Sequence, residues 1–312
     1  MTEADCAGGK LDHRSIIEDV VDTFEPSVLL REGAELSRHP DFERAMFRHT
    51  DAALETFADR PLETKLVCQT ARYVTICVIL YLHEKATADG GAVTVSQLQE
   101  VLSIKHFASA SWTRLAVRTF LRAGLIEELP PADDRRKRPF RPSPRLLEIG
   151  QDALGTMFEA LSIVRPLREN PHKLARRPGM LEGIAHATVA VHVRHGFTLL
   201  SAFPEIATLL ARDYGHLVFT NLIRTMRHAD GKTVEAEAPS LLLKRRFGVS
   251  RAQVRNVLSL AEEMNLISIE ARGGHVILLE PRFVTMCKHW VATDLAWMHL
   301  VSSHLDPVAD FG

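Results

Sequence analysis

Cysteine is scarce in this chain of 312 residues, and long apolar runs are missing. The four cysteines include no C-x-x-C pair and no disulfide-type spacing, which indicates reduced thiols. The longest apolar run, residues 74–82, is about half of the roughly 18 residues that a membrane span needs. No basic N-terminal region precedes an apolar stretch, so we expect no secretion signal. These absences argue against a membrane or disulfide-rich protein and predict a cytoplasmic location.

Signatures of common enzyme sites are also missing. The chain has no G-x-G-x-x-G, no phosphate-binding loop, no G-x-S-x-G and no H-E-x-x-H. Histidine is frequent, but its spacing matches no strong metal-binding pattern. We therefore predict no enzymatic activity, no metal and no cofactor. The residues nearest to a metal-ligand group are His172, His186, His192, His195, Cys287 and His289.

The net charge is only −1, but the charges are unevenly distributed. Residues 1–60 hold seven Lys or Arg and fourteen Asp or Glu, so the rest of the chain has a balance of +6. Basic residues outnumber acidic ones between positions 105 and 145. Such local clustering indicates a nucleic-acid partner, which the net charge alone would not suggest.

The most informative feature that is present is an internal repeat with an offset of 141 residues. Residues 73–126 align with residues 214–267 without a gap, and ten of the 54 pairs are identical. The match resumes after a short deletion, with residues 144–147 over 281–284. A repeat of this length indicates two copies of one structural unit. Identical pairs include Tyr73/Tyr214, Ser109/Ser250, Arg114/Arg255, Leu125/Leu266 and Ile126/Ile267.

Both copies have the pattern helix, helix, helix, β-hairpin, helix, which is the order of a winged helix-turn-helix domain. Ser96 and Ser109 are suited to cap helices of the first copy, and Ser250 a helix of the second. The first copy is expected to contain helices at 62–86, 97–103, 109–122 and 146–163, with a hairpin tip within 130–144. The second is expected to contain helices at 205–228, 239–246, 250–263 and 283–302, with a hairpin tip at 273–274.

The fold predicted from these elements is mainly α with small β-hairpin wings, in which two tandem winged helix-turn-helix domains form a pseudo-dimer. Short N-terminal helices should cover 15–36 and 40–58, and a bracing helix should cover 181–202. The acidic N-terminal helices should pack against the closing helices of the repeats, because phosphate repels them. The predicted divisions are an acidic segment (1–60), a first winged-helix domain (61–165), a linker with the bracing helix (166–204) and a second winged-helix domain (205–312).

The helix that begins after Ser250 is the sharpest candidate for base recognition. Its apolar residues Val254, Val257, Leu258 and Ala261 share one face and leave the other face to polar side chains. Arginine suits guanine, asparagine and glutamine suit adenine, and serine suits a phosphate oxygen. The alternative is an amphipathic helix with a solvated face. The predicted DNA contacts are Ser250, Arg251, Gln253, Arg255 and Asn256.

The counterpart in the first copy carries Arg114, Arg118 and Arg122 at every fourth position, which places them in one stripe. Trp112 aligns with Gln253 and either contacts DNA or is buried. The predicted contacts are Ser109, Ser111, Trp112, Arg114 and Arg118.

The tip of the first hairpin is basic and is either a phosphate and minor-groove contact or a solubilising loop. The second hairpin offers a single arginine. The predicted contacts in the hairpins are Arg135, Arg136, Lys137, Arg138 and Arg272.

On these features, residues 62–164 and 205–302 resemble winged-helix domains of the MarR class of bacterial transcription regulators. The resemblance rests on the Ser-x-x-x-Val/Thr-Arg helix, the Leu-Ile strand entry and the Asp-Arg element of the first hairpin. It implies major-groove recognition helices carrying Arg114 and Arg255, a minor-groove arginine (Arg135 or Arg136), dimerisation through terminal helices and a small aromatic effector. The chain departs from the pattern because it has two copies in one polypeptide and no Asp-Arg element in the second hairpin.

We therefore expect a sequence-specific double-stranded DNA-binding transcription regulator, acting as a monomeric pseudo-dimer or a homodimer and, by the resemblance, responsive to a ligand. Two alternatives remain open. One is a replication initiator with tandem winged helices. The other is a winged-helix protein-interaction module that does not bind DNA, which the near-neutral charge favours and the arginine stripe opposes.

Overall fold

The computed structural model describes residues 13–58, 60–67, 69–88, 92–104, 107–130, 138–228, 233–237, 240–270 and 276–305. Within these residues the protein is mainly helical with two small antiparallel sheets, as the sequence predicted. Within these ranges, no helix has both the length and the apolar character needed to cross a membrane.

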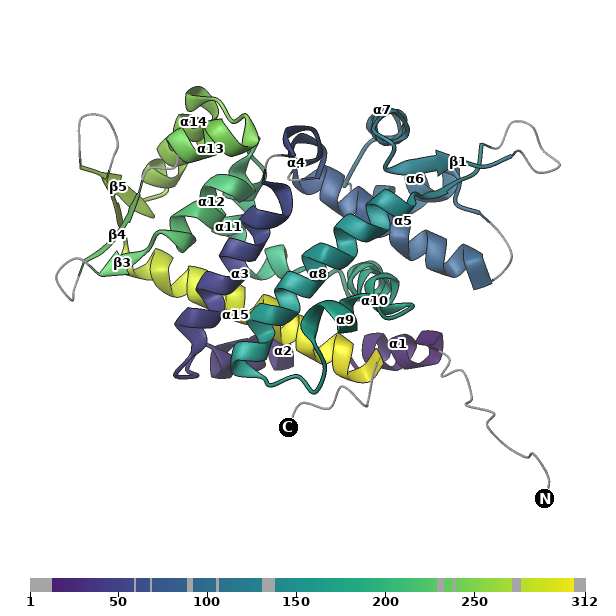
Figure 1. The fold of residues 1–312 in the computed structure, drawn as a ribbon, viewed down its shortest axis with the longest axis horizontal. Coiled ribbons are helices and arrows are strands. Elements are labelled where there is room, and N and C mark those ends of the chain that lie inside the picture. The colour runs from purple at the N-terminus through teal and green to yellow at the C-terminus, as the bar shows by residue number, and fades with distance from the viewer. Residues whose placement is uncertain are drawn as a thin grey trace, which may run out of the picture.

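Three N-terminal helices begin the described chain: α1 (His13–Asp22), α2 (Pro26–Leu36) and α3 (Phe42–Phe57). Proline suits the first turn of α2 because its φ is already helical and its missing N–H needs no partner there. α3 packs against α8 (Pro144–Val164), and α2 packs against α15 (Pro281–Leu305). The acidic segment therefore contacts the closing helices of both repeats, as its charge led us to expect (Figure 1).

The first repeat departs from the prediction at two points. The continuous helix expected at 62–86 is divided in two, and Thr94 rather than Ser96 caps the next helix. The Thr94 hydroxyl accepts the Gln97 N–H, and the Gln97 side chain accepts the Thr94 N–H, so a complete capping box fixes this start. The elements are α4 (Pro61–Val67), α5 (Thr70–Ala88), α6 (Val95–Ser103), α7 (Ala110–Arg122), β1 (Ile126–Glu128), β2 (Phe140–Pro142) and α8.

The connecting segment holds α9 (Pro171–Ala175), α10 (Met180–His195) and the short 3₁₀ helix η2 (Leu199–Ala202). The helix expected at 181–202 ends early because Gly196 adopts a left-handed conformation with φ of 67°. α10 packs along α5, and α1 packs on α10.

The second repeat has the same helix order with one addition. The predicted helix at 205–228 is divided where Tyr214 takes a left-handed φ of 60°, which a continuing helix does not tolerate. An antiparallel strand pair, β3 and β4, joins the sheet before the third helix, so this repeat has four strands in the order β3-β4-β6-β5. The elements are α11 (Pro204–Leu210), α12 (Gly215–Arg224), β3 (Arg227–His228), β4 (Val234–Glu237), α13 (Ser240–Phe247), α14 (Arg251–Glu263), β5 (Ile267–Ile269), β6 (Val276–Leu279) and α15.

Backbone details recur at the aligned positions of the two repeats. Gly124 and Asn265 both end a helix with positive φ, 67° and 53°. The next residues, Leu125 and Leu266, each donate an N–H back into that helix at 3.0 and 2.9 Å. Such agreement in local geometry supports the alignment more strongly than the identities alone.

An arginine at the second residue of each closing helix makes the same two contacts. Arg145 donates to the carbonyl oxygen of Ala123 and pairs with Glu63. Arg282 donates to the carbonyl oxygen of Met264 and pairs with a glutamate of α11 at 3.7 Å. In both repeats, a basic side chain therefore ties the closing helix to the end of α7 or α14.

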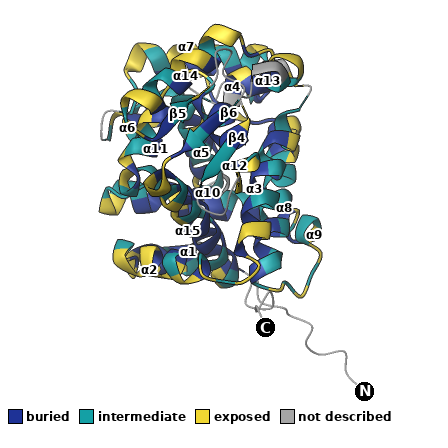
Figure 2. Ribbon diagram, turned by 90° about the vertical axis from the view of Figure 1, so that its left-hand side faces the viewer, coloured by how far each residue is buried: buried dark blue, intermediate teal, exposed yellow. Residues whose placement is uncertain are grey.

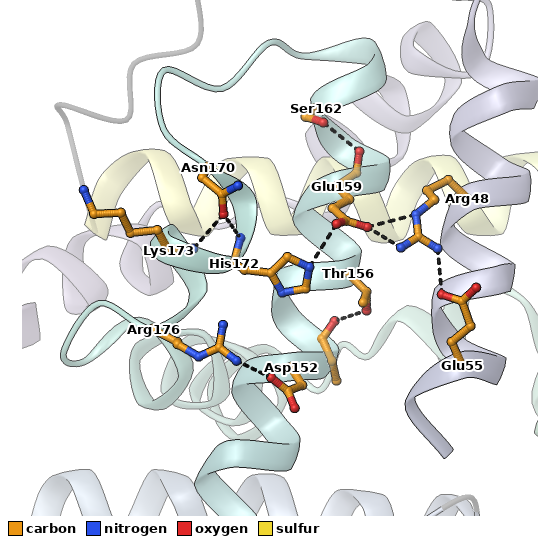
Figure 3. A network of polar contacts seen from close by, with 11 residues as sticks. Arg48, Glu55, Asp152, Thr156, Glu159, Ser162, Asn170, His172, Lys173 and Arg176 are labelled. Atoms are coloured by element: carbon orange, nitrogen blue, oxygen red, sulfur yellow. Dashed lines mark hydrogen bonds and ion pairs between the residues drawn. The ribbon is translucent and has the colours of Figure 1, made fainter. Parts of the chain in front are cut away.

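A polar network holds α3 and α9 onto α8 (Figure 3). Arg48 of α3 pairs with Glu55 and with Glu159 of α8, and Glu159 also accepts a hydrogen bond from His172 of α9 at 2.9 Å. The Arg48 guanidinium lowers the pKa of Glu159 despite partial burial. The network therefore connects helices that are not part of the predicted recognition surface. The buried residues of both repeats belong to one hydrophobic cluster.

Candidate nucleic-acid interface

The two helices predicted to read bases lie at the same end of the molecule. Figure 1 shows α7 and α14 at the top, with α4 and α13 beside them and α1 and α2 at the bottom. The view turned by 90° also places α7 and α14 together at one end (Figure 2). One surface can therefore present both helices to one partner.

The second-repeat helix α14 buries the face that the sequence predicted. Val254, Val257, Leu258 and Ala261 are all buried. Ser250 caps the helix through a 3.2 Å bond from the Gln253 N–H. The residues Arg251, Arg255 and Asn256 are exposed.

The Gln253 side chain is not free to contact DNA, contrary to the prediction. It is half-buried, and its side-chain oxygen accepts the Ser250 N–H at 2.9 Å, which completes a capping box. The cap occupies the acceptor of this amide, so Gln253 has less freedom to form the paired hydrogen bonds that adenine recognition requires.

In the first repeat, α7 also begins at its predicted cap, since Ser109 accepts the Trp112 N–H at 3.2 Å. Ser111 is exposed and its hydroxyl lies 3.1 Å from that of Ser109. Trp112 is half-buried and packs against the core, which favours the packing alternative for this residue. The stripe of Arg114, Arg118 and Arg122 is exposed.

Most of the basic side chains on α4, α7, α13 and α14 share a property that the sequence did not predict: they form no ion pair within the described residues. Elsewhere, most arginines are neutralised, such as Arg48, Arg176 and Arg194 by carboxylates of neighbouring helices. Of the Lys and Arg side chains that the structure describes and that form no ion pair, most lie on or beside α4, α7, α13 and α14. They are Arg60, Lys65, Arg114, Arg118, Arg122, Lys244, Arg245, Arg251 and Arg255. The others are Arg31, Arg38, Arg72, Arg165 and Arg212.

Lys65, Lys244 and Arg245 were missed in the sequence reasoning. The signal for the last two was available, because residues 240–261 contain five basic and no acidic residues. α7 likewise contains no Asp or Glu. The N-terminal ends of α7 and α14, which Ser109 and Ser250 cap, also carry the partial positive charge of the helix dipole.

The described residues of the hairpins add fewer unpaired positive charges to this surface than α7, α13 and α14 do. Arg138 lies 3.7 Å from Glu128 across the first hairpin, and Arg141 lies 3.1 Å from Glu127, so both are partly neutralised. The predicted contacts Arg135, Arg136, Lys137 and Arg272 lie outside the described residues.

A separate titratable cluster lies where α3, α12 and α15 meet. His49 Nε2 is 3.4 Å from Asp294 Oδ2. Burial raises the pKa of Asp294 to about 7 and lowers the pKa values of His49 and His216 to about 4. The Nδ1 atoms of both histidines have no hydrogen-bond partner within the described chain. These pKa shifts link the packing of α3 on the second repeat to pH.

The histidines considered as metal ligands have other roles. His186 bonds to Glu84 at 2.5 Å, His195 bonds to the carbonyl oxygen of Val21 at 2.7 Å, and His172 belongs to the α8 network. Within the described ranges, no group of three or more His, Cys, Asp or Glu residues is arranged to hold a metal ion.

Comparisons with known proteins identify no relative from which a role could be transferred. No family model matches the chain. The searches of curated proteins and of solved structures likewise gave no significant match, so the site has to be interpreted from its own geometry.

Proposed function

We propose that this protein is a sequence-specific double-stranded DNA-binding transcription regulator whose α7 and α14 read bases in the major groove. The observation that carries the proposal is the gathering of unpaired Lys and Arg side chains around these two helices. Cations gathered on one surface repel one another, so the cluster does not stabilise the free protein. A polyanion supplies the missing partners.

The repeated element order supports two tandem winged helices of the type seen in MarR-class regulators. In each repeat, four helices precede an antiparallel hairpin and a closing helix, and the last three of them match the predicted winged-helix order. The two closing helices, α8 and α15, also contact each other. One chain would then supply both halves of a pseudo-dimer.

Duplex binding at two salt concentrations tests the proposal. Fluorescence anisotropy with a labelled mixed-sequence duplex should show affinity falling by about a thousandfold or more between about 50 and 200 mM salt if six or more phosphates are contacted. A variant with Arg31→Ala and Arg38→Ala is the matched control, because these unpaired arginines lie on or next to α2 at the opposite end. It should bind as the wild type does.

Selection from a randomised duplex pool tests sequence specificity. Because the recognition helices differ, the selected site should contain two unlike half-sites, about 10 base pairs apart from centre to centre. Absence of salt-sensitive duplex binding would contradict the proposal and favour the protein-interaction module.

A further inference from the structure

An exposed leucine lies beside the arginine stripe of α7. Leu115 is 57% exposed, more than any other large hydrophobic residue that the structure describes. Its neighbours Arg114 and Arg118 are exposed and form no ion pair. The exposed Leu115 side chain buries little apolar area in the free protein. A partner that covered this side chain would gain free energy by removing apolar area from water.

The structure gives Leu115 a defined counterpart on α14. Both helices start from a serine whose hydroxyl accepts the N–H three residues later, from Trp112 and from Gln253. Counted from these caps, Leu115 and Asn256 occupy the same helical position, as do Arg114 and Arg255. Both Leu115 and Asn256 are exposed, so they project from equivalent places on the two helices.

The chemistry of these two side chains suits different bases. Asparagine presents a donor and an acceptor together, which match N7 and the N6 amino group of adenine. Leucine has neither, and its natural major-groove contact is the apolar C5-methyl group of thymine. Trp112 and Gln253 are less suited to these tasks, because Trp112 packs against the core and Gln253 is held in a cap.

We propose that Leu115 and Asn256 are the residues that make the two half-sites unlike, with Leu115 selecting thymine in one and Asn256 selecting adenine in the other. The flanking Arg114 and Arg255 are common to both helices and set the shared part of the site. This inference rests on the proposed function, since it applies only if α7 and α14 enter the major groove.

Reciprocal substitutions test the assignment by selection from a randomised duplex pool. Leu115→Asn should change the preferred base at one position of the α7 half-site from thymine to adenine, and Asn256→Leu should make the opposite change in the α14 half-site. Direct titration of the paired duplexes should show that each preference changes by between about 5-fold and 100-fold.

Leu30→Asn is the matched control, because Leu30 is also exposed (37%) but lies on α2 at the other end of the molecule. It should leave the selected site unchanged. If both recognition-helix variants keep the wild-type site while retaining salt-sensitive binding, the assignment of Leu115 and Asn256 is overturned and the proposed function stands. If the wild type binds no duplex, the proposed function fails first, and the assignment fails with it.

Discussion

The two repeats share a backbone plan but distribute their positive charge differently. In the first repeat, the unpaired cations lie on the candidate recognition helix itself, at Arg114, Arg118 and Arg122. In the second, α14 ends in Glu262 and Glu263, and the cations move partly to the preceding helix α13. The comparison teaches that capping and packing preserve the position of a helix while its exposed residues diverge. Base preference and phosphate contact can therefore differ between copies of one fold.

Their sheets differ for a related reason. Val93 of the first repeat forms only an isolated bridge to Phe140, whereas its counterpart Val234 begins a four-residue strand paired with β6. The added strand uses residues that, in the first repeat, begin α6. α13 consequently starts four positions later than α6 under the 141-residue offset. The second repeat thus has the larger sheet, and the first repeat has the longer helix at this position, α6 compared with α13.

The largest expected effect concerns whether the repeats unfold together. Phe120 and Phe219 are both fully buried in the shared core, one in each repeat. Each substitution to alanine should lower the free energy of unfolding by about 3–5 kcal/mol. Phe219→Ala should cost more, because that ring packs edge-on against Phe283 and Trp290. Calorimetry should show one transition for the wild type and both variants, and two separate transitions would contradict a shared core.

The next effect concerns the closing helices, which differ in charge at an aligned position. Counted from their first prolines, Asp294 of α15 corresponds to Met157 of α8. Asp294 has a folded pKa of about 7, so between about pH 4 and 7 the folded state keeps a proton that the unfolded state loses. Its contribution to stability is therefore present at low pH and is lost as the pH rises to 7. Asp294→Asn should raise the free energy of unfolding at pH 8 by about 2–4 kcal/mol.

The buried histidines give the opposite dependence. The folded pKa values of His49 and His216 are about 4, so their stabilising neutral form is lost as the pH falls from 6.5 toward 4. Between about pH 4 and 6.5, two histidines make the folded state more stable as the pH rises, and one aspartate makes it less stable. The histidines have the larger combined effect, so the wild type should be least stable near pH 4. Denaturant unfolding between about pH 4 and 8 tests both pH dependences. A free energy of unfolding that does not change with pH would show that the cluster of His49, His216 and Asp294 does not titrate as its burial requires.

The third prediction compares the charges of the two repeats. Replacing Arg114, Arg118 and Arg122 by alanine should reduce the slope of log affinity against log salt by about 2.7, if each contacts one phosphate. Replacing Lys244 and Arg245 should reduce it by about 1.8 on the same basis. Equal slopes for the wild type and the α7 variant would mean that the first repeat does not contact phosphate.

The smallest effect concerns the equivalence of the two helix starts. Ser109→Ala and Ser250→Ala should each cost about 1 kcal/mol of stability, because each removes one hydrogen bond to the first turn. Gln253→Ala should add a few tenths of a kcal/mol in the second repeat alone, where it completes the capping box. Thermal unfolding measures these losses, and a clear inequality between the serine variants would weaken the alignment of Leu115 with Asn256.

The sequence by itself determined the features that depend on neighbouring residues. The caps at Ser109 and Ser250, the buried face of α14 and the two hairpins follow from side-chain hydrogen bonding, helical periodicity and turn chemistry over a few residues. The sequence also predicted short N-terminal helices over 15–36 and 40–58, because Pro26 and Pro40 interrupt the helical pattern.

Only the tertiary structure decided which side chains have partners. The breaks within the helices predicted at 62–86 and 205–228 are not visible in the local pattern, which remains helical. The same holds for charge: Arg145 and Arg114 are both exposed arginines in the sequence pattern, but only Arg145 meets a carboxylate from a distant helix. Ion pairing and burial depend on residues far apart in the chain. The basic surface around α7 and α14 and the titratable cluster between α3, α12 and α15 could therefore be found only once the helices were placed in space.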